Sequence, residues 1–538
     1  MKNIYIKHIM RNSVMMAAIV CCTFTSCKKS LEGEYLNPDG FTNPTPEGFY
    51  SNVQQQLGVF RTSYGEYFHN FEAFNMRLGT GGVVNAGAAN TFGWGYAPYG
   101  DIYNRLRSIR AMNDAIAKLP ADQQKEYEVF VWTGNVIKDY LFYQLTDAYN
   151  DVPYTEAMKA QDNLFLPKFD KQQFIYTSIL ADLKDVSGKL KNYQIGGSAI
   201  QKLILQNDIW FAGDIIKWRT FINSLRLRLG MRISIADPQL AKATIQEVLQ
   251  DGVYAKNRAG SITLVDKQTD RAMEFLITRA LDELRGRGGG YLWLPQNMMK
   301  VLRKTGQPDD PRIPVLFQPD KDGNYTPMPA EANDITPAFR ERIDLTDLSK
   351  TFPSLYNRST FERNVGMPAL ILTSSEVHFI MAEAGLRWPD LGISVTDEFR
   401  AGIQESIDIY YEINAGNKDT GYNGFIAASM PVKPLQAIID VFLTAKVTEF
   451  NTANATEKLG LIYDQRYVHF NMLKPYELWA DTRRLTKELG ARVKKGASNF
   501  LVMERTVYPT TEETNNGENF QAVRASNNYT SPVWWTGR

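Results

Sequence analysis

The chain has 538 residues, and its 60 Lys and Arg against 59 Asp and Glu give a formal net charge of +1. This balance argues against nucleic acid as a partner, which needs a concentrated basic surface, and against docking on anionic lipid by charge alone. All three cysteines, Cys21, Cys22 and Cys27, lie near the N-terminus, so the rest of the chain offers neither a disulfide nor a thiolate metal site. A body of this length can be stabilised by its hydrophobic core.

Residues 1–26 have the features of an export signal. Basic residues precede a short apolar stretch that ends in Phe24-Thr25-Ser26-Cys27. An apolar stretch this short does not span a bilayer as a helix, so we expect a cleaved signal peptide. The residues before Cys27 resemble a lipobox, which implies that the Cys27 thiol carries a lipid anchor; ordinary cleavage without lipid is the alternative. Residues 27–45 would then be a lipidated tether, and 46–538 a single body.

Helical periodicity dominates two stretches of this body. Over 210–234, apolar residues recur at alternating steps of four and three and form one stripe along a helix. Residues 128–149 repeat the pattern and end before the sequence NDVP, whose turn residues and proline stop a helix. A capping aspartate before proline, Asp237-Pro238, is a further start signal. Other helices are predicted at 46–60, 100–118, 171–190, 237–250, 375–388, 395–414, 432–450 and 456–488.

The composition changes between about residues 255 and 370. Prolines crowd this region and a glycine-rich stretch precedes them, a pattern that breaks helices. The region also holds too many aromatic residues for a disordered linker. We therefore predict an all-α body that carries one long, irregular, loop-rich excursion over about 255–370. The glycine- and aromatic-rich stretch at 79–100 has the same character.

Catalytic and metal-binding signatures are mostly absent from the sequence. We find no P-loop, no His-Glu-x-x-His and no Gly-x-Ser-x-Gly motif. The segment QPDKDGNYTPMP (318–329) resembles a calcium loop, but Gln318 and Pro329 stand where an EF-hand needs an acidic ligand and a bidentate glutamate. We predict a turn with solvated carboxylates, no metal site and no cofactor. A looser structural calcium site remains the alternative.

Aromatic and amide side chains in the glycine-rich segments are the candidates for ligand binding. A sugar ring stacks its apolar C–H face on Trp or Tyr, while its hydroxyls pair with Asn, Asp and Arg; peptides can use the same groups. Any single ring can instead pack its loop onto the body, but several together predict a platform. The candidate set is Trp94, Tyr96, Tyr99, Asp101, Asn104, Tyr291, Trp293, Asn324 and Tyr325.

Several segments of the body resemble the SusD/RagB family of surface lipoproteins. They are GDIIKWRTFINSLRLRLGMRIS (213–234), KDYLFYQLTDAYNDVPYTEA (138–157), PALILTSSEVHFIMAEAGLR (368–387) and IYDQRYVHFNMLKPYELWADTRR (462–484), followed by YPTTEETNNGENFQAV (508–523). The resemblance covers nearly the whole body, in order. One departure is Leu485, where glycine often follows the two arginines.

This resemblance implies tetratricopeptide-like helix pairs and a variable excursion that carries the ligand site. It further implies a lipid-anchored outer-membrane protein on the cell surface that binds nutrient and delivers it to a SusC-like TonB-dependent transporter. The nutrient would be an oligosaccharide or, in RagB-like relatives, a peptide. The matching residues, such as Trp218, Glu376 and Arg483, identify the scaffold and do not carry over as binding residues.

Two other functions stay open at this point. An all-helical glycan hydrolase would need two carboxylates that face one glycosidic bond, which the sequence alone does not place. A purely structural helical-repeat scaffold is the second alternative. We expect a binding protein rather than an enzyme.

Overall fold

The computed structural model describes residues 45–56, 98–264, 293–331, 334, 336–343, 353–361, 364, 367–417, 430–493 and 502–538. Helices dominate these residues, and the short strands among them form two-stranded antiparallel sheets. Within the same residues, none of the helices has both the length and the hydropathy that a membrane crossing requires.

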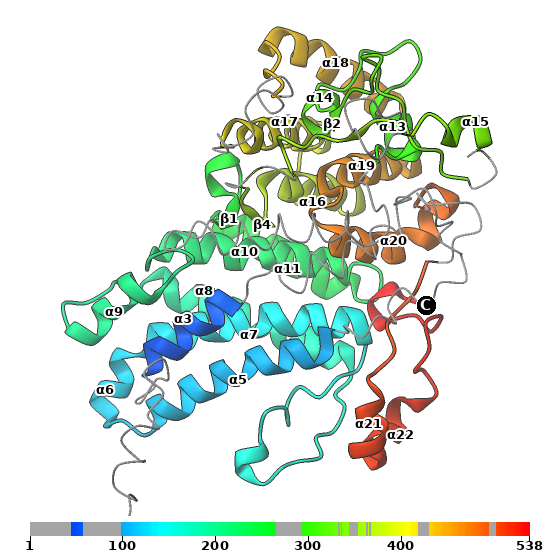
Figure 1. Cartoon of the computed structure of the whole chain (residues 1–538). Coiled ribbons are helices and arrows are strands. Elements are labelled where there is room, and N and C mark those ends of the chain that lie inside the picture. The colour runs from blue at the N-terminus through cyan, green and yellow to red at the C-terminus, as the bar shows by residue number, and fades with distance from the viewer. Residues whose placement is uncertain are drawn as a thin grey trace, which may run out of the picture.

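The first half of the body is a stack of helices that pack one against the next in chain order (Figure 1). Their apolar stripes face one continuous core, so each helix buries what its neighbour exposes. The short helices α6 (Ala121–Glu126) and α9 (Ala199–Asn207) lie at one end of the stack. The long helices are α3 (Pro46–Gln56), α5 (Pro98–Ala117), α7 (Glu128–Tyr149), α8 (Gln172–Lys191), α10 (Ile215–Arg232) and α11 (Pro238–Asp251).

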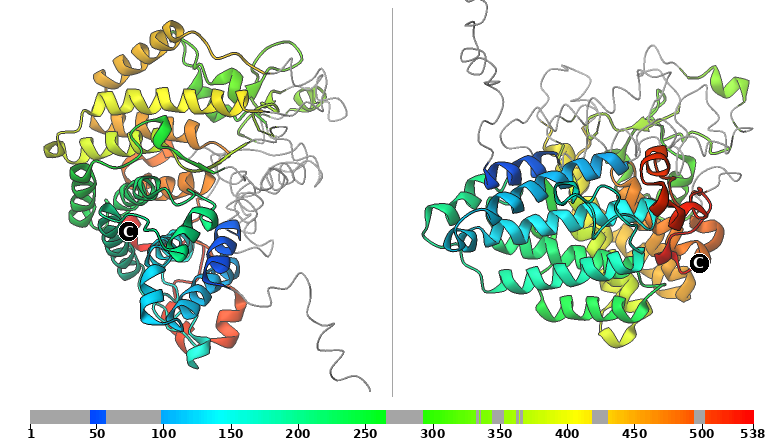
Figure 2. Two further views of the ribbon diagram at one scale, coloured as in Figure 1. Left: turned by 90° about the vertical axis from the view of Figure 1, so that its left-hand side faces the viewer. Right: turned by 90° about the horizontal axis from the view of Figure 1, so that it is seen from below.

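The second half repeats this arrangement above the first. The helix α16 (Ser374–Arg387) packs against α17 (Val395–Ala415) on one side and against α10 on the other, and so joins the halves. Figure 2 shows the two stacks from two further sides. The remaining helices are α18 (Gln436–Thr452), α19 (Ala455–Phe470), α20 (Pro475–Leu489), α21 (Thr510–Asn515) and α22 (Gly517–Arg524). This succession of helix pairs confirms the predicted all-α, tetratricopeptide-like fold.

The predicted loop-rich excursion is also confirmed. Its two ends meet where β1 (Ile262–Leu264) pairs antiparallel with β4 (Ala369–Leu372), so the excursion leaves and rejoins the helical body at one place. The described residues between them include a second small sheet. This sheet consists of β2 (Phe317–Gln318) and β3 (Leu355–Tyr356). The short helices around it are α13 (Gln296–Leu302), α14 (Ile313–Leu316) and α15 (Pro337–Arg340).

The helix predicted from residue 210 begins only at Ile215. The residues before it form a tight turn around the buried Asp208 carboxylate, which accepts hydrogen bonds from Gly213 N (2.9 Å) and Trp218 Nε1 (2.8 Å). Ala212 and Gly213 both have positive φ, 52° and 76°, which a helix does not permit. The apolar spacing continues through this turn, so periodicity alone placed the start too early.

The single helix predicted over 456–488 is wrong. The chain forms α19 and α20, separated by a turn in which Asn471 adopts φ 29°. Pro475 then begins α20, because proline has no N–H to donate but fits the first turn of a helix. The helices α6 and α9 were not predicted; α6 buries none of its residues, so it has no apolar stripe to detect.

The arginines that lie off the apolar stripe of α10 are buried as well. Arg228 donates from Nε to Glu376 Oε1 at 2.5 Å and from Nη2 to Oε2 at 2.9 Å, and Arg232 donates to Asp147 Oδ2 at 2.7 Å and also pairs with Glu477. Burial tends to raise the pKa of Glu477, but the guanidinium groups of Arg228 and Arg232 outweigh it and lower this pKa to about 2.

Buried charges of this kind persist only when they are paired. The pairs connect α10 to α7, α16 and α20, so these charged side chains bind the two halves of the body together. Glu376 is 0% exposed. These residues therefore lie in the scaffold and not on a ligand-binding surface.

Candidate ligand-binding surface

Some of the candidate residues lie outside the described part of the chain. This applies to Trp94, Tyr96 and Tyr291, and also to Cys27 and most of the predicted tether. The predictions for these residues therefore remain as the sequence states them.

The start of α5 carries three candidates with different surroundings. Tyr99 is only 4% exposed and packs edge-on against Tyr103 and Tyr149, with ring centroids 5.0 and 5.1 Å away. Burial raises the pKa of its phenol well above the usual value. Asp101 is half-buried and lies 3.7 Å from the Arg105 guanidinium, while Asn104 is exposed.

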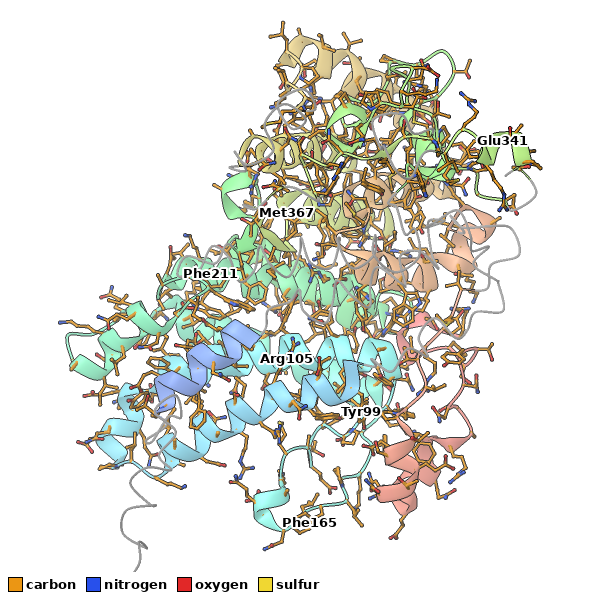
Figure 3. All side chains as sticks on the ribbon, viewed as in Figure 1. Tyr99, Arg105, Phe165, Phe211, Glu341 and Met367 are labelled. Carbon is orange, nitrogen blue, oxygen red and sulfur yellow. The ribbon has the colours of Figure 1, made fainter. Side chains whose placement is uncertain are left out.

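Asp101 and Asn104 are three residues apart, and residues at this spacing share one side of a helix. Tyr99 therefore fastens the first turn of α5 to the body, and Asp101 with Asn104 presents polar groups on its outer side. Figure 3 labels Tyr99 and Arg105 at this helix.

Trp293 is completely buried in the described structure. Its backbone forms an antiparallel bridge with Leu355, and its ring belongs to a small apolar cluster with Met328 and Leu355. A hydrogen bond from Leu294 N to Ser354 O (2.9 Å) fixes the same segment. The ring packs the excursion together and offers no face to solvent, so Trp293 packs its loop onto the body and is not free to stack on a sugar.

Asn324 and Tyr325 lie in a tight turn of the excursion. The Asn324 side chain is exposed and Tyr325 is half-buried, with burial raising the pKa of its phenol. The turn is organised by Asp320, whose Oδ1 accepts hydrogen bonds from Asp322 N and Asn324 N, both at 2.9 Å. Its Oδ2 accepts from Thr326 Oγ1 at 2.6 Å.

These bonds explain the calcium-like pattern of the sequence. The Asp320 carboxylate is 7% exposed and already accepts hydrogen bonds on both oxygens, so it closes a turn. Asp322 is exposed and pairs with its neighbour Lys321 at 2.7 Å. Gly323 has a φ of 81°, which only glycine adopts at no cost. Among the residues that the structure describes, no group of three or more His, Cys, Asp or Glu is arranged to hold a metal ion.

The described candidates form two separate groups. Asp101 and Asn104 lie on α5, in the lower half of the view in Figure 1, and Asn324 and Tyr325 follow β2 in the excursion, whose elements α13, α14 and β2 lie in the upper part of that view. A single platform built from all of these side chains is not what the described residues show. A ligand that contacted both groups would have to be long, or would use only one of them.

A loop between α7 and α8, held by hydrogen bonds, was not predicted from the sequence. Its tip exposes Phe165 (69%) and Leu166 (50%), and Figure 3 shows Phe165 at the end of this loop, away from the helices. Asp170 closes the base of the loop by accepting from Thr155 N at 2.7 Å, and Asn519 donates to Leu166 O at 3.0 Å. The apolar sequence LFLP between turn residues was the available signal.

Comparisons with known proteins fit this structure. Residues 89–509 match the SusD-like family, described as starch-binding associating with outer membrane. No curated protein matches the chain.

Several solved structures share the fold. A SusD homologue from Bacteroides fragilis is 18% identical with a TM-score of 0.67, covering 92% of this chain and 100% of its own. A chitin-binding protein is 22% identical, with a TM-score of 0.64 and coverage of 92% and 100%. A chitin-binding SusD homologue from Flavobacterium johnsoniae is 18% identical, with a TM-score of 0.59 and coverage of 91% and 98%. Because the family match spans most of the chain and the fold agrees with it, this chain belongs to the SusD-like family.

Proposed function

We propose that this protein captures glycan at the outer membrane and delivers it to a SusC-like TonB-dependent transporter. The observation that carries the proposal is the family match over residues 89–509, whose description joins starch binding to the outer membrane. The shared fold with two chitin-binding proteins supports a glycan as the ligand class. A lipid on Cys27 would hold the protein at the membrane, since the buried methylenes of acyl chains each contribute about 0.8 kcal/mol.

The proposed binding surface combines stacking rings with exposed polar groups. Trp94, Tyr96 and Tyr291 supply rings from the glycine-rich segments, and Tyr325 supplies a half-buried ring beside the exposed Asn324. A second polar group consists of Asp101 and Asn104. Tyr99 and Trp293 would not contact the ligand themselves. Their buried rings would support the segments that carry the other candidate residues.

The proposed activity is binding without bond cleavage. The buried carboxylates Asp147, Glu376 and Glu477 are engaged by arginines inside the scaffold, so they are not available to flank a glycosidic bond. A peptide-binding role would use the same surface and is decided by the ligand tested. Incubation with starch, chitin and peptide pools, followed by analysis of soluble products, would detect hydrolysis if it occurred.

Calorimetry with malto-oligosaccharides, chito-oligosaccharides of matched length and a peptide pool tests the proposal. We expect one glycan series to bind, and Tyr325→Ala or Trp94→Ala to weaken it by about 1–3 kcal/mol, because a stacking ring is lost. Phe165→Ala is the control, because it removes a ring that is 69% exposed but is not among the proposed binding residues. Equal affinity in all three variants would place the site elsewhere, and binding by peptides alone would overturn the glycan proposal.

Partnership with a transporter is tested separately. The protein would be extracted in mild detergent from cells grown on the glycan that binds and recovered through an affinity tag. A durable complex should bury more than about 1,000 Å² and survive washing, so a large outer-membrane barrel should co-purify. Repeated recovery of the chain alone would favour a free-standing surface binder.

A further inference from the structure

The outer side of α18, together with the segment just before it, exposes several large apolar side chains. Ile438 and Val441 are 58% and 61% exposed, and Leu435, directly before the helix, is 76% exposed. Successive residues of an α-helix are rotated by about 100° around its axis, which places the residues that share the solvent side with Ile438 and Val441. Their side chains are small or uncharged. In order, this outer stripe consists of Ala437, Ile438, Val441, Thr444, Ala445, Thr448 and Thr452.

The outer stripe carries no charge, and two of its three threonine hydroxyls donate hydrogen bonds within the helix. Thr448 Oγ1 donates to Thr444 O at 2.8 Å, and Thr452 Oγ1 donates to Thr448 O at 3.1 Å. A surface whose hydroxyls already have partners loses little when water is removed from it. Four helical turns without a charged residue are unusual on a surface that faces only water.

The charged residues at the borders of the stripe are paired with other parts of the body. Asp440 lies 2.8 Å from Arg400, and Lys433 lies 2.6 Å from Asp408. Glu449 pairs with Lys304 on the other border. No charge is therefore directed over the stripe, and an apolar protein surface fits it better than an anionic lipid surface or a charged partner.

The order of side-chain sizes along the stripe favours a second copy of this chain. The larger apolar residues Ile438 and Val441 lie toward the N-terminal half of α18, and the smaller Ala445 and Thr448 lie toward the C-terminal half. In an antiparallel pair related by a two-fold axis at residue 443, Ile438 faces Thr448 and Val441 faces Ala445 of the other copy. Each large side chain then packs against a small one, which allows close approach of the helices.

We propose that two copies of this protein associate through antiparallel pairing of their α18 helices. A helix of 17 residues is about 25 Å long, so such a contact buries less than the roughly 1,000 Å² of a stable interface. The dimer is therefore weak in dilute solution and forms where copies are concentrated, as on a membrane. Antiparallel alignment also opposes the two helix dipoles favourably.

Site-directed disulfide formation in the full chain, in its native membranes, tests both the partner and the register. Copies that carry Val441→Cys and Ala445→Cys, with different epitope tags, would be co-expressed and oxidised. We expect the mixed disulfide at least tenfold above the level from the parent chain, because facing residues fall within the 7 Å Cα separation that a disulfide permits. Copies that carry Ile438→Cys and Thr448→Cys should form a mixed disulfide to a similar extent.

Ile438→Cys alone is the register control. The cysteines at position 438 of the two protein copies would be separated by ten residues, or about 15 Å along the helix axis, and should not cross-link. Adding Val441→Asp to the Ile438→Cys and Thr448→Cys pair should abolish the mixed disulfide, with unchanged melting temperature and unchanged glycan affinity. The affinity measurement separates this proposal from the proposed function, because either can fail without the other.

Other results would overturn the dimer. Cross-linking of the α18 cysteines to a different, larger protein would make the stripe a transporter contact. Thiols that resist a water-soluble maleimide and form no cross-link would show that the stripe is covered within the same chain. Reactive thiols without a mixed disulfide would leave the stripe without a partner.

Discussion

Asp139 is a carboxylic acid enclosed in the helical body. It is completely buried, and its nearest cation is the Lys138 ammonium, 3.4 Å from Oδ1. Burial raises its pKa from an ordinary value of 3.8 to about 8, because this single neighbour does not offset the loss of water. The folded protein therefore holds Asp139 protonated at neutral pH, while the unfolded chain ionises it.

This difference makes folding stability depend on pH. The carboxyl group of Asp139 has a higher pKa in the folded protein than in the unfolded chain. Its contribution to folding stability is therefore fully present below pH 3.8 and is lost progressively as the pH rises toward 8. Asp139→Asn removes the titration, so we expect the variant to be more stable than the parent by about 1–4 kcal/mol at pH 7. Urea unfolding at pH 7 and near pH 3.5 checks this. The two proteins should differ little at the lower pH, and a stability difference that did not change with pH would contradict the buried-acid explanation.

Two glycines inside helices separate the effects of packing and propensity at the scale of elements. Gly402 lies where α17 crosses α16, and a Cβ there would come within 2.6 Å of Phe379 Cε1. Gly188 is an exposed residue of α8, and a Cβ there would meet nothing within 4 Å.

Gly402→Ala should therefore destabilise the protein by about 1–3 kcal/mol through overpacking, since Phe379 is fully buried and cannot move freely. Gly188→Ala should stabilise by up to about 1 kcal/mol, because alanine has the higher helix propensity and no clash. Both changes are measured by thermal or urea unfolding. Stabilisation by Gly402→Ala would show that the α16–α17 crossing is looser than the structure has it.

The elements were predictable wherever an apolar stripe met a start or stop signal. Asp237 caps α11 by accepting from Leu240 N at 3.0 Å, and Asn150 ends α7 with a φ of 67°, as the sequence suggested. The errors came from turns that keep apolar spacing. Around Asp208, the turn is set by side-chain hydrogen bonds from Gly213 and Trp218, and no local periodicity contains that information.

The candidate site was harder to predict than the helices. An aromatic residue in a loop gives the same sequence pattern whether its ring packs against the body or binds a ligand. Trp293 and Tyr325 both lie in the excursion, yet one is enclosed by Met328 and Leu355 and the other is half-buried. The difference arises from the bridge between Trp293 and Leu355, which are more than sixty positions apart in the chain. Sequence spacing cannot specify such a pairing.

The C-terminal segment of the chain returns to the end of α7 and packs against it. Thr506 N donates to Ala148 O at 2.8 Å, and Trp534 N donates to Asn150 Oδ1 at 2.8 Å. Trp535 is 0% exposed and donates from Nε1 to Asp147 Oδ1 at 2.8 Å. Contacts between residues so distant in the chain can form only once both halves are in place, so they couple the two stacks into one cooperative unit.

Trp535 is the residue through which this coupling can be measured. Its ring lies beneath the Arg232 and Arg483 guanidinium groups, with the carbons 5.4 and 4.7 Å from the ring centroid. Trp535→Ala should cost about 3–5 kcal/mol, as expected for a large aromatic removed from a core, and Trp535→Phe less, since it removes mainly the donor to Asp147. Hydrogen exchange should accelerate first at the C-terminal end of α7.

Trp132 is the control for this loss of protection, because it lies on the same helix but is half-buried against Tyr193 at 5.4 Å, far from the C-terminal segment. Trp132→Ala should cost less and should affect the start of α7 rather than its end. If Trp535→Ala left the exchange of residues 147–152 unchanged while the overall stability fell, the C-terminal segment would stabilise only its immediate surroundings. The stacks would then be coupled through the buried charges between Arg228 and Glu376 instead, a connection that does not involve the chain terminus.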